Sequence, residues 1–171
     1  IEQLYKDKDP TVRANIASNP ETPVKIIKHL SKDKDINVII NISGNTKTPK
    51  DILKLIANEN KLNENSKDIE EAIENISRIH YQLLLHDELD ESILEIIADS
   101  PDEWVRASIA NHSNVTLNIL KKLSIDLDED VRRCVAESEK INLEIFNLLL
   151  NDSSKNVRTA ISTNPLKTSI L

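Results

Sequence analysis

The sequence has very little glycine, cysteine or aromatic residue, and it has no methionine. One of its 171 residues is glycine, Gly44, and six are proline. So little glycine argues against a sheet protein with many tight turns, and it leaves no glycine loop to hold a phosphate. The single cysteine, Cys134, excludes an internal disulfide framework and a metal site built from several cysteines. We therefore expect no cofactor and no metal.

Basic clusters and long apolar runs are also missing. The formal net charge is −7, and no basic run is longer than two residues. Binding to nucleic acid needs a dense basic face, so no nucleic-acid partner is expected. No apolar run approaches the roughly 20 residues of a membrane span, and no signal peptide is visible. The sequence therefore predicts a cytoplasmic protein without a membrane partner.

What the chain has instead is a 26-residue period. Successive marker residues are separated by 26, 41, 26, 26 and 26 positions, and the 41 is one period plus a 15-residue insertion. These markers are Val12, Val38, Ile79, Val105, Val131 and Val157. Repeats of this length are typical of solenoids, which usually act as binding surfaces rather than as catalysts. We therefore predict one helical-repeat array over residues 1–171.

Each repeat is expected to hold two short helices, called A and B. Helix B begins at residues whose side-chain oxygen can cap a first turn, namely Asp9, Asp35, Asp102, Asp128 and Ser154. Apolar columns three and seven residues after the cap, followed by a column of small residues, form one buried stripe.

The ends of these helices are also predicted. Helix B should stop at Asn19, Asn45, His86, His112, Ser138 and Asn164, because asparagine tolerates the left-handed conformation that often ends a helix. Helix A should start at Thr22 and Thr48, each a threonine cap followed by a proline in the first turn.

Arginine recurs directly after the Val column. It stands at positions 13, 106, 132 and 158, whereas Ile39 and His80 take the same place in two repeats. The structural interpretation is an arginine that bonds carbonyls or caps of the next repeat. The alternative is a column of arginines that binds a ligand directly.

From Asp9 to Leu30 the first repeat matches almost throughout the pattern Asp-Pro-x-Val-Arg-x-x-Ile-Ala-x-Asn-Pro-x-Thr-Pro-x-x-Ile-Leu-x-x-Leu. It resembles the leucine-rich repeat variant, a relative of HEAT-type repeats. The resemblance implies an all-α, right-handed α-solenoid of about six two-helix repeats, and it implies hardly anything about activity. Some members carry a cysteine cluster for an iron–sulfur centre, but this chain lacks those cysteines. We therefore expect a non-enzymatic protein.

The insertion covers about residues 58–76. A polar loop is predicted first, and then a helix over about 67–85 that lengthens helix B of the third repeat. Its extra isoleucines either pack on their own loop or dock a partner. Six complete periods and the insertion account for the whole chain, and neither end carries a polar capping repeat. We therefore expect a segment of a longer protein, or self-association through the uncapped ends.

Subtracting the buried columns leaves exposed positions on each B helix, which in HEAT-like stacks usually line the concave side. They include the only tryptophan and one of the two tyrosines, the residue types most enriched at binding hot spots. The candidate partner-binding residues are Ile40, Arg78, Tyr81, Leu85, Trp104, Asn111 and Arg133. The predicted function is a scaffold that binds a protein or peptide through this B-helix face.

Two other functions remain open. One is a structural spacer within a longer array. The other is a HEAT-like nucleic-acid-binding or DNA glycosylase module, for which Trp104 beside Asp102 imitates an aromatic residue with a catalytic carboxylate. Asp102 falls in the cap column, however, and the net charge has the wrong sign.

Three further motifs have a structural explanation or lack the partners that a functional site would need. His86 and His112 fall in the column that ends helix B, and a metal site would need a third ligand. The acidic run 126–137 partly matches a calcium loop, but Val131 stands where that loop requires glycine. Cys134 follows two arginines, which can lower the pKa of a thiol, but no catalytic constellation accompanies it.

Overall fold

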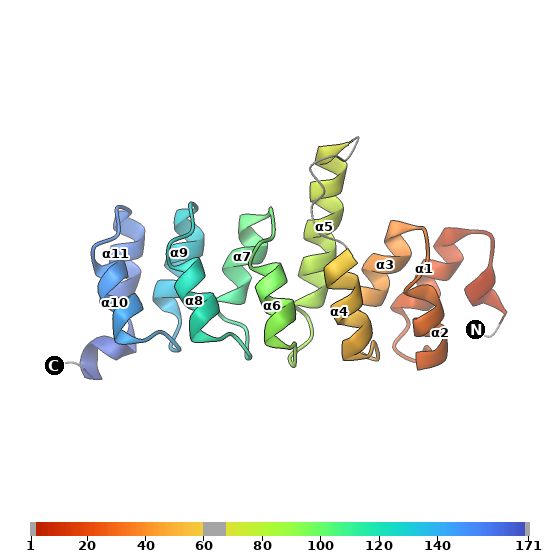
Figure 1. The fold of residues 1–171 in the computed structure, drawn as a ribbon, viewed down its shortest axis with the longest axis horizontal. Coiled ribbons are helices and arrows are strands. Elements are labelled where there is room, and N and C mark those ends of the chain that lie inside the picture. Colours follow the sequence, from red (N-terminus) through yellow and green to blue (C-terminus); the bar gives the residue numbers. More distant parts are fainter. Residues whose placement is uncertain (1–2, 60–67, 170–171) are drawn as a thin grey trace. The chain divides into compact units, whose positions relative to one another are not determined.

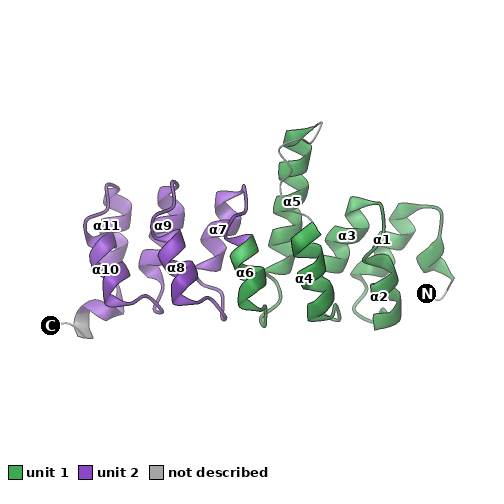
Figure 2. Ribbon diagram, viewed as in Figure 1, with its two compact units in different colours: residues 1–96 green, residues 97–171 purple. Residues whose placement is uncertain are grey.

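The computed structural model describes residues 3–59 and 68–169. Across these residues it contains eleven α-helices, two short 3₁₀ helices and no strand (Figure 1). The expected all-α class is confirmed. The chain divides into two compact units, residues 1–96 and 97–171 (Figure 2).

Unit 1 contains two rows of helices. The helices α1, α3 and α5 pack side by side in chain order, and α2 and α4 pack against this row. The elements are η1 (Leu4–Lys6), α1 (Pro10–Ser18), α2 (Val24–Leu30), α3 (Ile36–Ser43), α4 (Lys50–Glu59), α5 (Ile69–Leu83) and α6 (Glu91–Ile97), whose last residue opens unit 2.

Unit 2 repeats this arrangement. The helices α7, α9 and α11 pack side by side, and α8 and α10 pack against them. The elements are α7 (Glu103–Ile109), α8 (Leu117–Leu123), α9 (Glu129–Glu137), α10 (Leu143–Leu150), α11 (Lys155–Ser162) and η2 (Pro165–Ser169). The odd-numbered helices correspond to the predicted B helices, and the even-numbered ones to the predicted A helices.

The predicted buried stripe forms the core of each unit. The Val column is buried from Val38 to Val157 and only half-buried at Val12. The column four residues later is buried throughout, from Ile16 to Ile161. Each such side chain contributes about 1.5–3 kcal/mol when fully removed from water, so this stripe supplies much of the favourable free energy of folding.

The predicted caps of the B helices are confirmed. All five side chains accept hydrogen bonds from backbone N–H groups of the first turn; Asp9, for example, accepts from Thr11 at 2.8 Å. Pro10 occupies the first turn of α1, where its missing N–H costs nothing.

The predicted starts of the A helices are wrong by one residue. The N-cap of α2 is Pro23, and α4 begins at Lys50. The threonine hydroxyls donate instead to carbonyls of the preceding B helix: Thr22 Oγ1 to Ile16 at 2.6 Å, and Thr48 Oγ1 to Ile42 at 2.7 Å. These buried threonines therefore fasten the turn between the two helices rather than capping the second one.

The left-handed ends of the B helices are also wrong. None of the described residues has a positive φ, and Asn19 at the end of α1 is extended, with φ −72° and ψ 120°. Side chains of this column bond to neighbouring segments instead; Asn45, for example, donates to the carbonyl of Ala17.

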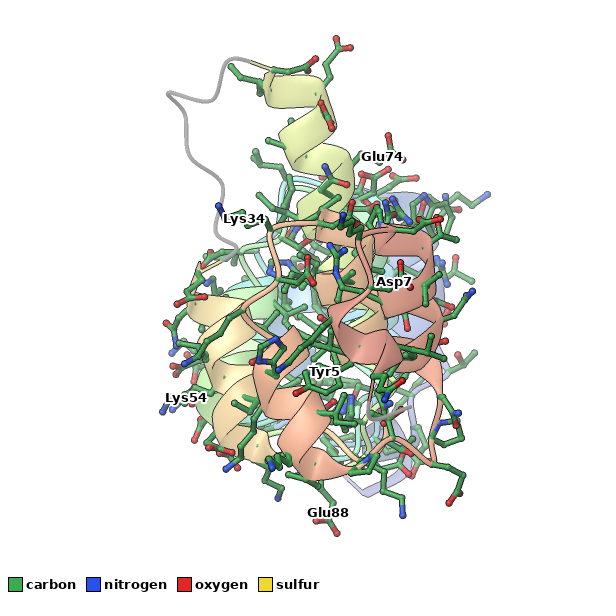
Figure 3. All side chains as sticks on the ribbon, turned by 90° about the vertical axis from the view of Figure 1, so that its right-hand side faces the viewer. Tyr5, Asp7, Lys34, Lys54, Glu74 and Glu88 are labelled. Carbon is green, nitrogen blue, oxygen red and sulfur yellow. The ribbon has the colours of Figure 1, made fainter. Side chains whose placement is uncertain are left out.

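Helix α5 carries the insertion. It begins at Ile69, where the Asp68 side chain accepts from Glu71 N at 3.0 Å, and it ends at Leu83. Helix α5 lies inside the helix predicted for 67–85 and is two residues shorter at each end, whereas the polar loop predicted before it lies outside the described residues. The first turns of α5 rise beyond α3 and α4, and Glu74 lies on this part (Figures 1 and 3). Ile69 is exposed there, and burial is reached only at Ile76.

Candidate functional site

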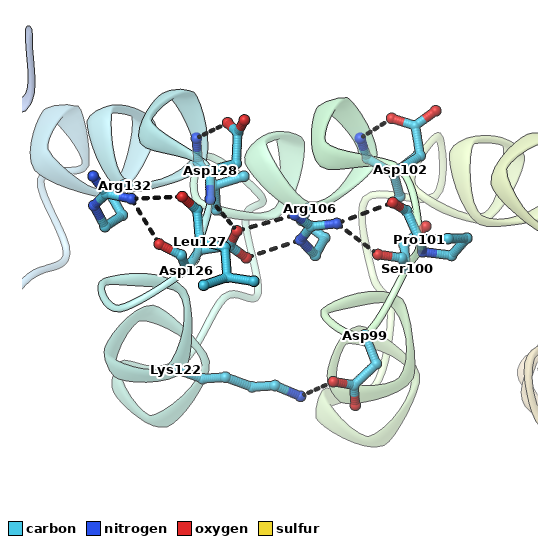
Figure 4. Close-up of polar contacts among 12 residues, drawn as sticks. Asp99, Ser100, Pro101, Asp102, Arg106, Lys122, Asp126, Leu127, Asp128 and Arg132 are labelled. Atoms are coloured by element: carbon cyan, nitrogen blue, oxygen red, sulfur yellow. Dashed lines mark hydrogen bonds and ion pairs between the residues drawn. The ribbon is translucent and has the colours of Figure 1, made fainter. Parts of the chain in front are cut away.

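Three arginines of the predicted column make the same set of bonds. Nε and Nη2 of Arg106 donate to Asp126, which lies twenty residues further on, at 2.8 and 3.0 Å. Its Nη1 donates to the carbonyls of Ser100 and Pro101 (Figure 4). We call the pairs with this geometry the arginine ladder: Arg13–Asp33, Arg106–Asp126 and Arg132–Asp152. Arg158 makes the two carbonyl bonds, to Asp152 and Ser153.

The ladder carboxylates are held in their charged form. Hydrogen bonds from Arg13 and Arg132 lower the pKa of Asp33 and Asp152, respectively. Burial acts to raise the pKa of Asp126, but bonds from Arg106 and from the N–H of Asp128 outweigh it and the pKa is lowered. The structural interpretation of these arginines is confirmed in part. Every guanidinium of the ladder is occupied within the chain, but the carbonyls belong to the turn before the arginine's own helix, and the bond to the next repeat goes to an aspartate side chain rather than to a carbonyl or a cap.

A second set of bonds comes from the column that ends the B helices. Asn45 Nδ2 donates to the carbonyls of Ala17 and Asn19, at 2.6 and 2.9 Å. Asn164 makes the same pair of bonds in unit 2, and Ser138 Oγ donates to Ala110. His86 Nε2 lies 2.7 Å from the carbonyl oxygen of Ser43. The capping column therefore links each B helix to the one before it within a unit.

The remaining acidic motif has structural partners throughout. Asp126 belongs to the arginine ladder, Asp128 caps α9, and Asp130 pairs with Arg133 at 3.0 Å. Across residues 3–59 and 68–169, no group of three or more possible ligands is placed to hold a metal ion.

Cys134 is half-buried on α9. Burial raises the pKa of its thiol, and the charge of Arg133 only partly opposes this. The expected lowering of the thiol pKa by the neighbouring arginines is therefore wrong, since Arg132 donates to Asp152 and Arg133 to Asp130 and Glu137.

In unit 1, three of the predicted partner-binding residues are exposed at the end of α5. Tyr81 and Leu85 are each 55% exposed, and Arg78 lies one turn earlier, with Nη2 3.3 Å from Asn37 Oδ1 on α3. We call Arg78, Tyr81 and Leu85 the α5 surface. Ile40 does not join it, because its side chain is only 5% exposed and the expected exposure is wrong.

In unit 2, Trp104 is the most exposed aromatic side chain described, at 67%. It is the second residue of α7, and Asn111 is exposed just after the end of that helix. We call Trp104 and Asn111 the α7 surface. Ala107 of the same helix stands outside the two predicted apolar columns and the small-residue column, yet it is buried. Arg133 on α9 is half-buried between Asp130 and Glu137 and offers less to a partner than expected.

Tyr81 and Trp104 thus belong to different units, and each surface stands on its own. Two exposed apolar side chains between α8 and α9 are absent from the predicted binding residues. Ile125 is largely exposed, and Leu127 is fully exposed. Neither falls in a buried column, which is the signal that could have identified them. His80, which takes the place of the arginine on α5, is 2% exposed, and neither ring nitrogen has a hydrogen-bond partner among the described residues.

In the described part of the chain, no helix is both long and apolar enough to span a bilayer. No protein-family model matches the chain, and comparisons with curated proteins and with solved structures gave no match.

Proposed function

We propose that this chain is a non-enzymatic helical-repeat scaffold that binds a protein or peptide partner. The single observation that carries the proposal is the exposure of large side chains on B helices. Tyr81 and Trp104 leave more than half of their surface in water on helices whose other faces are packed. Exposed aromatic residues on a rigid helix are frequent anchors of protein interfaces.

The proposed architecture is a right-handed α-solenoid of about six repeats, similar to the leucine-rich repeat variant. Bonds that recur at fixed separations support it. The ladder pairs are 20 residues apart in both units, and Asn45 and Asn164 reach carbonyls 26 and 28 residues earlier. A stack in which each repeat contacts only its neighbours produces such regularity.

The α5 surface suits a partner with an apolar anchor beside a negative group. Tyr81 and Leu85 supply apolar area, and Arg78 supplies a guanidinium one turn away. The bond from Arg78 to Asn37 is 3.3 Å long and exposed, so a carboxylate of a partner could replace it at small cost.

The test uses Trp104 as a reporter, since it is the only tryptophan of the chain. Peptides are selected from a random library on the wild-type chain, and their binding is measured by tryptophan fluorescence and by calorimetry. Truncation of a hot-spot aromatic typically costs about 2 kcal/mol or more. We therefore expect Tyr81→Ala or Trp104→Ala to weaken binding at least about thirtyfold, and Leu148→Ala, an exposed residue on an A helix, to leave it unchanged.

Two other outcomes of these experiments would favour the alternative functions. If no selected peptide distinguishes the wild type from the Tyr81→Ala/Trp104→Ala double variant, the binding proposal is wrong and the spacer function is favoured. If a DNA duplex binds with a steep dependence on salt, the nucleic-acid function is favoured instead.

A further inference from the structure

In unit 1 the column that supplies the ladder arginines carries another residue at two places, Ile39 and His80. Position 39 stands one repeat period after Arg13 and belongs to the same column, but it carries isoleucine. Glu59 stands one period after Asp33, so the carboxylate that would pair with an arginine at position 39 is still present. The carboxylate of this pair is therefore retained at Glu59, and the arginine is replaced by Ile39.

A cavity of about 400 Å³ lies at this step. Its lining includes Ile39 of α3, Leu55 and Glu59 of α4, and Ser31 and Asp33 of the turn after α2. Leu55 and Glu59 are exposed, so the cavity is open to water on the α4 side. Lys32 also borders it, with an exposed side chain that is free to turn outward.

The neighbouring pair, Arg13–Asp33, shows which acceptors a guanidinium bonds at the corresponding place. Arg13 donates from Nε and Nη2 to Asp33, and from Nη1 to the carbonyls of Asp7 and Lys8. Shifted by one period, the corresponding acceptors are the Glu59 carboxylate and the carbonyls of Asp33 and Lys34. The two carbonyls lie at the same place before the cap of α3 as the first two do before the cap of α1.

We propose that this cavity binds the guanidinium of an arginine side chain from a protein partner, which completes the ladder in trans. A planar guanidinium fits a carboxylate with two parallel bonds, and an ammonium does not. Ile39, Leu55 and Ile56 supply the apolar wall along which the methylene groups of an arginine can lie. The inference rests on the proposed function for the nature of the partner, but its site shares no residue with the α5 surface.

The test uses a small arginine probe, so it succeeds or fails independently of the α5 and α7 surfaces. Nα-acetyl-arginine methylamide is titrated into the chain labelled at isoleucine and leucine methyl groups, and NMR shifts are followed at Ile39 and Leu55. The matched probes are the corresponding lysine and citrulline amides. Citrulline has the shape of arginine without its charge.

We expect saturable shifts at Ile39 and Leu55 with the arginine probe, and binding at least about tenfold weaker for lysine and for citrulline. Glu59→Gln should weaken the binding of arginine about tenfold, because the charged acceptor is lost. Glu21→Gln removes an exposed carboxylate elsewhere in unit 1 and should leave binding unchanged. Equal responses to arginine and lysine, or no dependence on Glu59, would overturn the proposal.

A second variant keeps the proposal testable if the free probe binds too weakly to saturate. Ile39→Arg places the guanidinium in cis, so it should abolish the shifts at Leu55 and raise the urea midpoint of unfolding. Ile39→Lys should raise it less, and the gain from Ile39→Arg should disappear in combination with Glu59→Gln. A destabilised Ile39→Arg variant whose midpoint is unaffected by Glu59→Gln would show that the cavity does not accept a guanidinium. Loss of the response to the arginine probe, with peptide binding still dependent on Tyr81, would remove this inference and leave the proposed function standing.

Discussion

Arg106 donates two parallel hydrogen bonds to the carboxylate of Asp126. Its third nitrogen donates to two carbonyls of the turn before its own helix. Both side chains are largely withdrawn from water, at 16% and 12% exposure. Removing one partner leaves the other partly buried and unpaired, so we expect Arg106→Met to lower the free energy of unfolding by about 2–3 kcal/mol. Urea denaturation followed by circular dichroism measures this.

Arg133 provides the matched control for Arg106. It pairs with Asp130 and Glu137 on the surface of its own helix, and each of these partners is about half exposed. Such pairs contribute only about 0.3–0.5 kcal/mol, so Arg133→Met should change stability little. Similar losses for Arg106→Met and Arg133→Met would show that the ladder is no stronger than a surface ion pair.

Asn45 should contribute to stability through its reach to α1. Both of its side-chain bonds end on carbonyls of another segment, and Asn45 is buried. We expect Asn45→Ala to cost about 1–3 kcal/mol, because the carbonyl of Ala17 loses a buried hydrogen bond. The carbonyl of Asn19 still accepts from Thr22 N at 3.0 Å. Asn58→Ala, which removes an exposed bond to Lys54 within one helix, should cost far less. A neutral Asn45→Ala variant in urea denaturation would contradict this role.

His80 should make stability depend on pH. Burial lowers the pKa of its side chain from 6.5 to about 4. Between these values the unfolded chain binds a proton that the folded chain does not, so stability falls as the pH falls from about 6.5 to about 4. The full effect is about 3 kcal/mol, at about 1.4 kcal/mol for each pKa unit.

The measurement for His80 is the urea midpoint at pH 7 and at pH 5. His80→Leu should reduce the loss between the two values, because the titrating group is gone. His29→Gln changes an exposed histidine of the same unit and should keep the wild-type loss. If His80→Leu retained the full dependence on pH, another group would be responsible for it.

Trp104 should matter little for folding. Two thirds of its surface is in water, so Trp104→Ala is expected to cost less than about 1 kcal/mol. Ile109→Ala on the same helix removes a fully buried side chain and should cost about 2–5 kcal/mol. Thermal unfolding of both variants checks this. A loss at Trp104 as large as that at Ile109 would mean that the indole supports the fold, which weakens its proposed role in binding.

The buried columns and B-helix caps could be predicted from the sequence because both depend on local spacing. Residues three and seven positions after a cap lie on the same face of a helix whatever the rest of the chain does. The partners of the arginines were missed, although each carboxylate lies twenty residues after its arginine. That spacing was visible in the sequence, but the aspartates lie in turns, outside the aligned helical columns.

The error at Ile40 has a different cause. Removing two apolar columns treats a helix as if it had one buried side. In unit 1, α3 has neighbours on both flanks, α1 and α5, so residues beside the stripe are covered as well. The sequence pattern of one helix does not contain this information, because it depends on which helices lie next to it.

The bonds from Asn45 and Asn164 have a consequence for how such a chain changes over evolution. Both side chains end on main-chain oxygens, and every residue type supplies one. A duplicated segment that carries the asparagine therefore finds its acceptors in any neighbour of the same backbone shape, without matching substitutions there. Segments one period long can be gained, lost or exchanged as whole pieces, and the link between them is inherited with the donor alone.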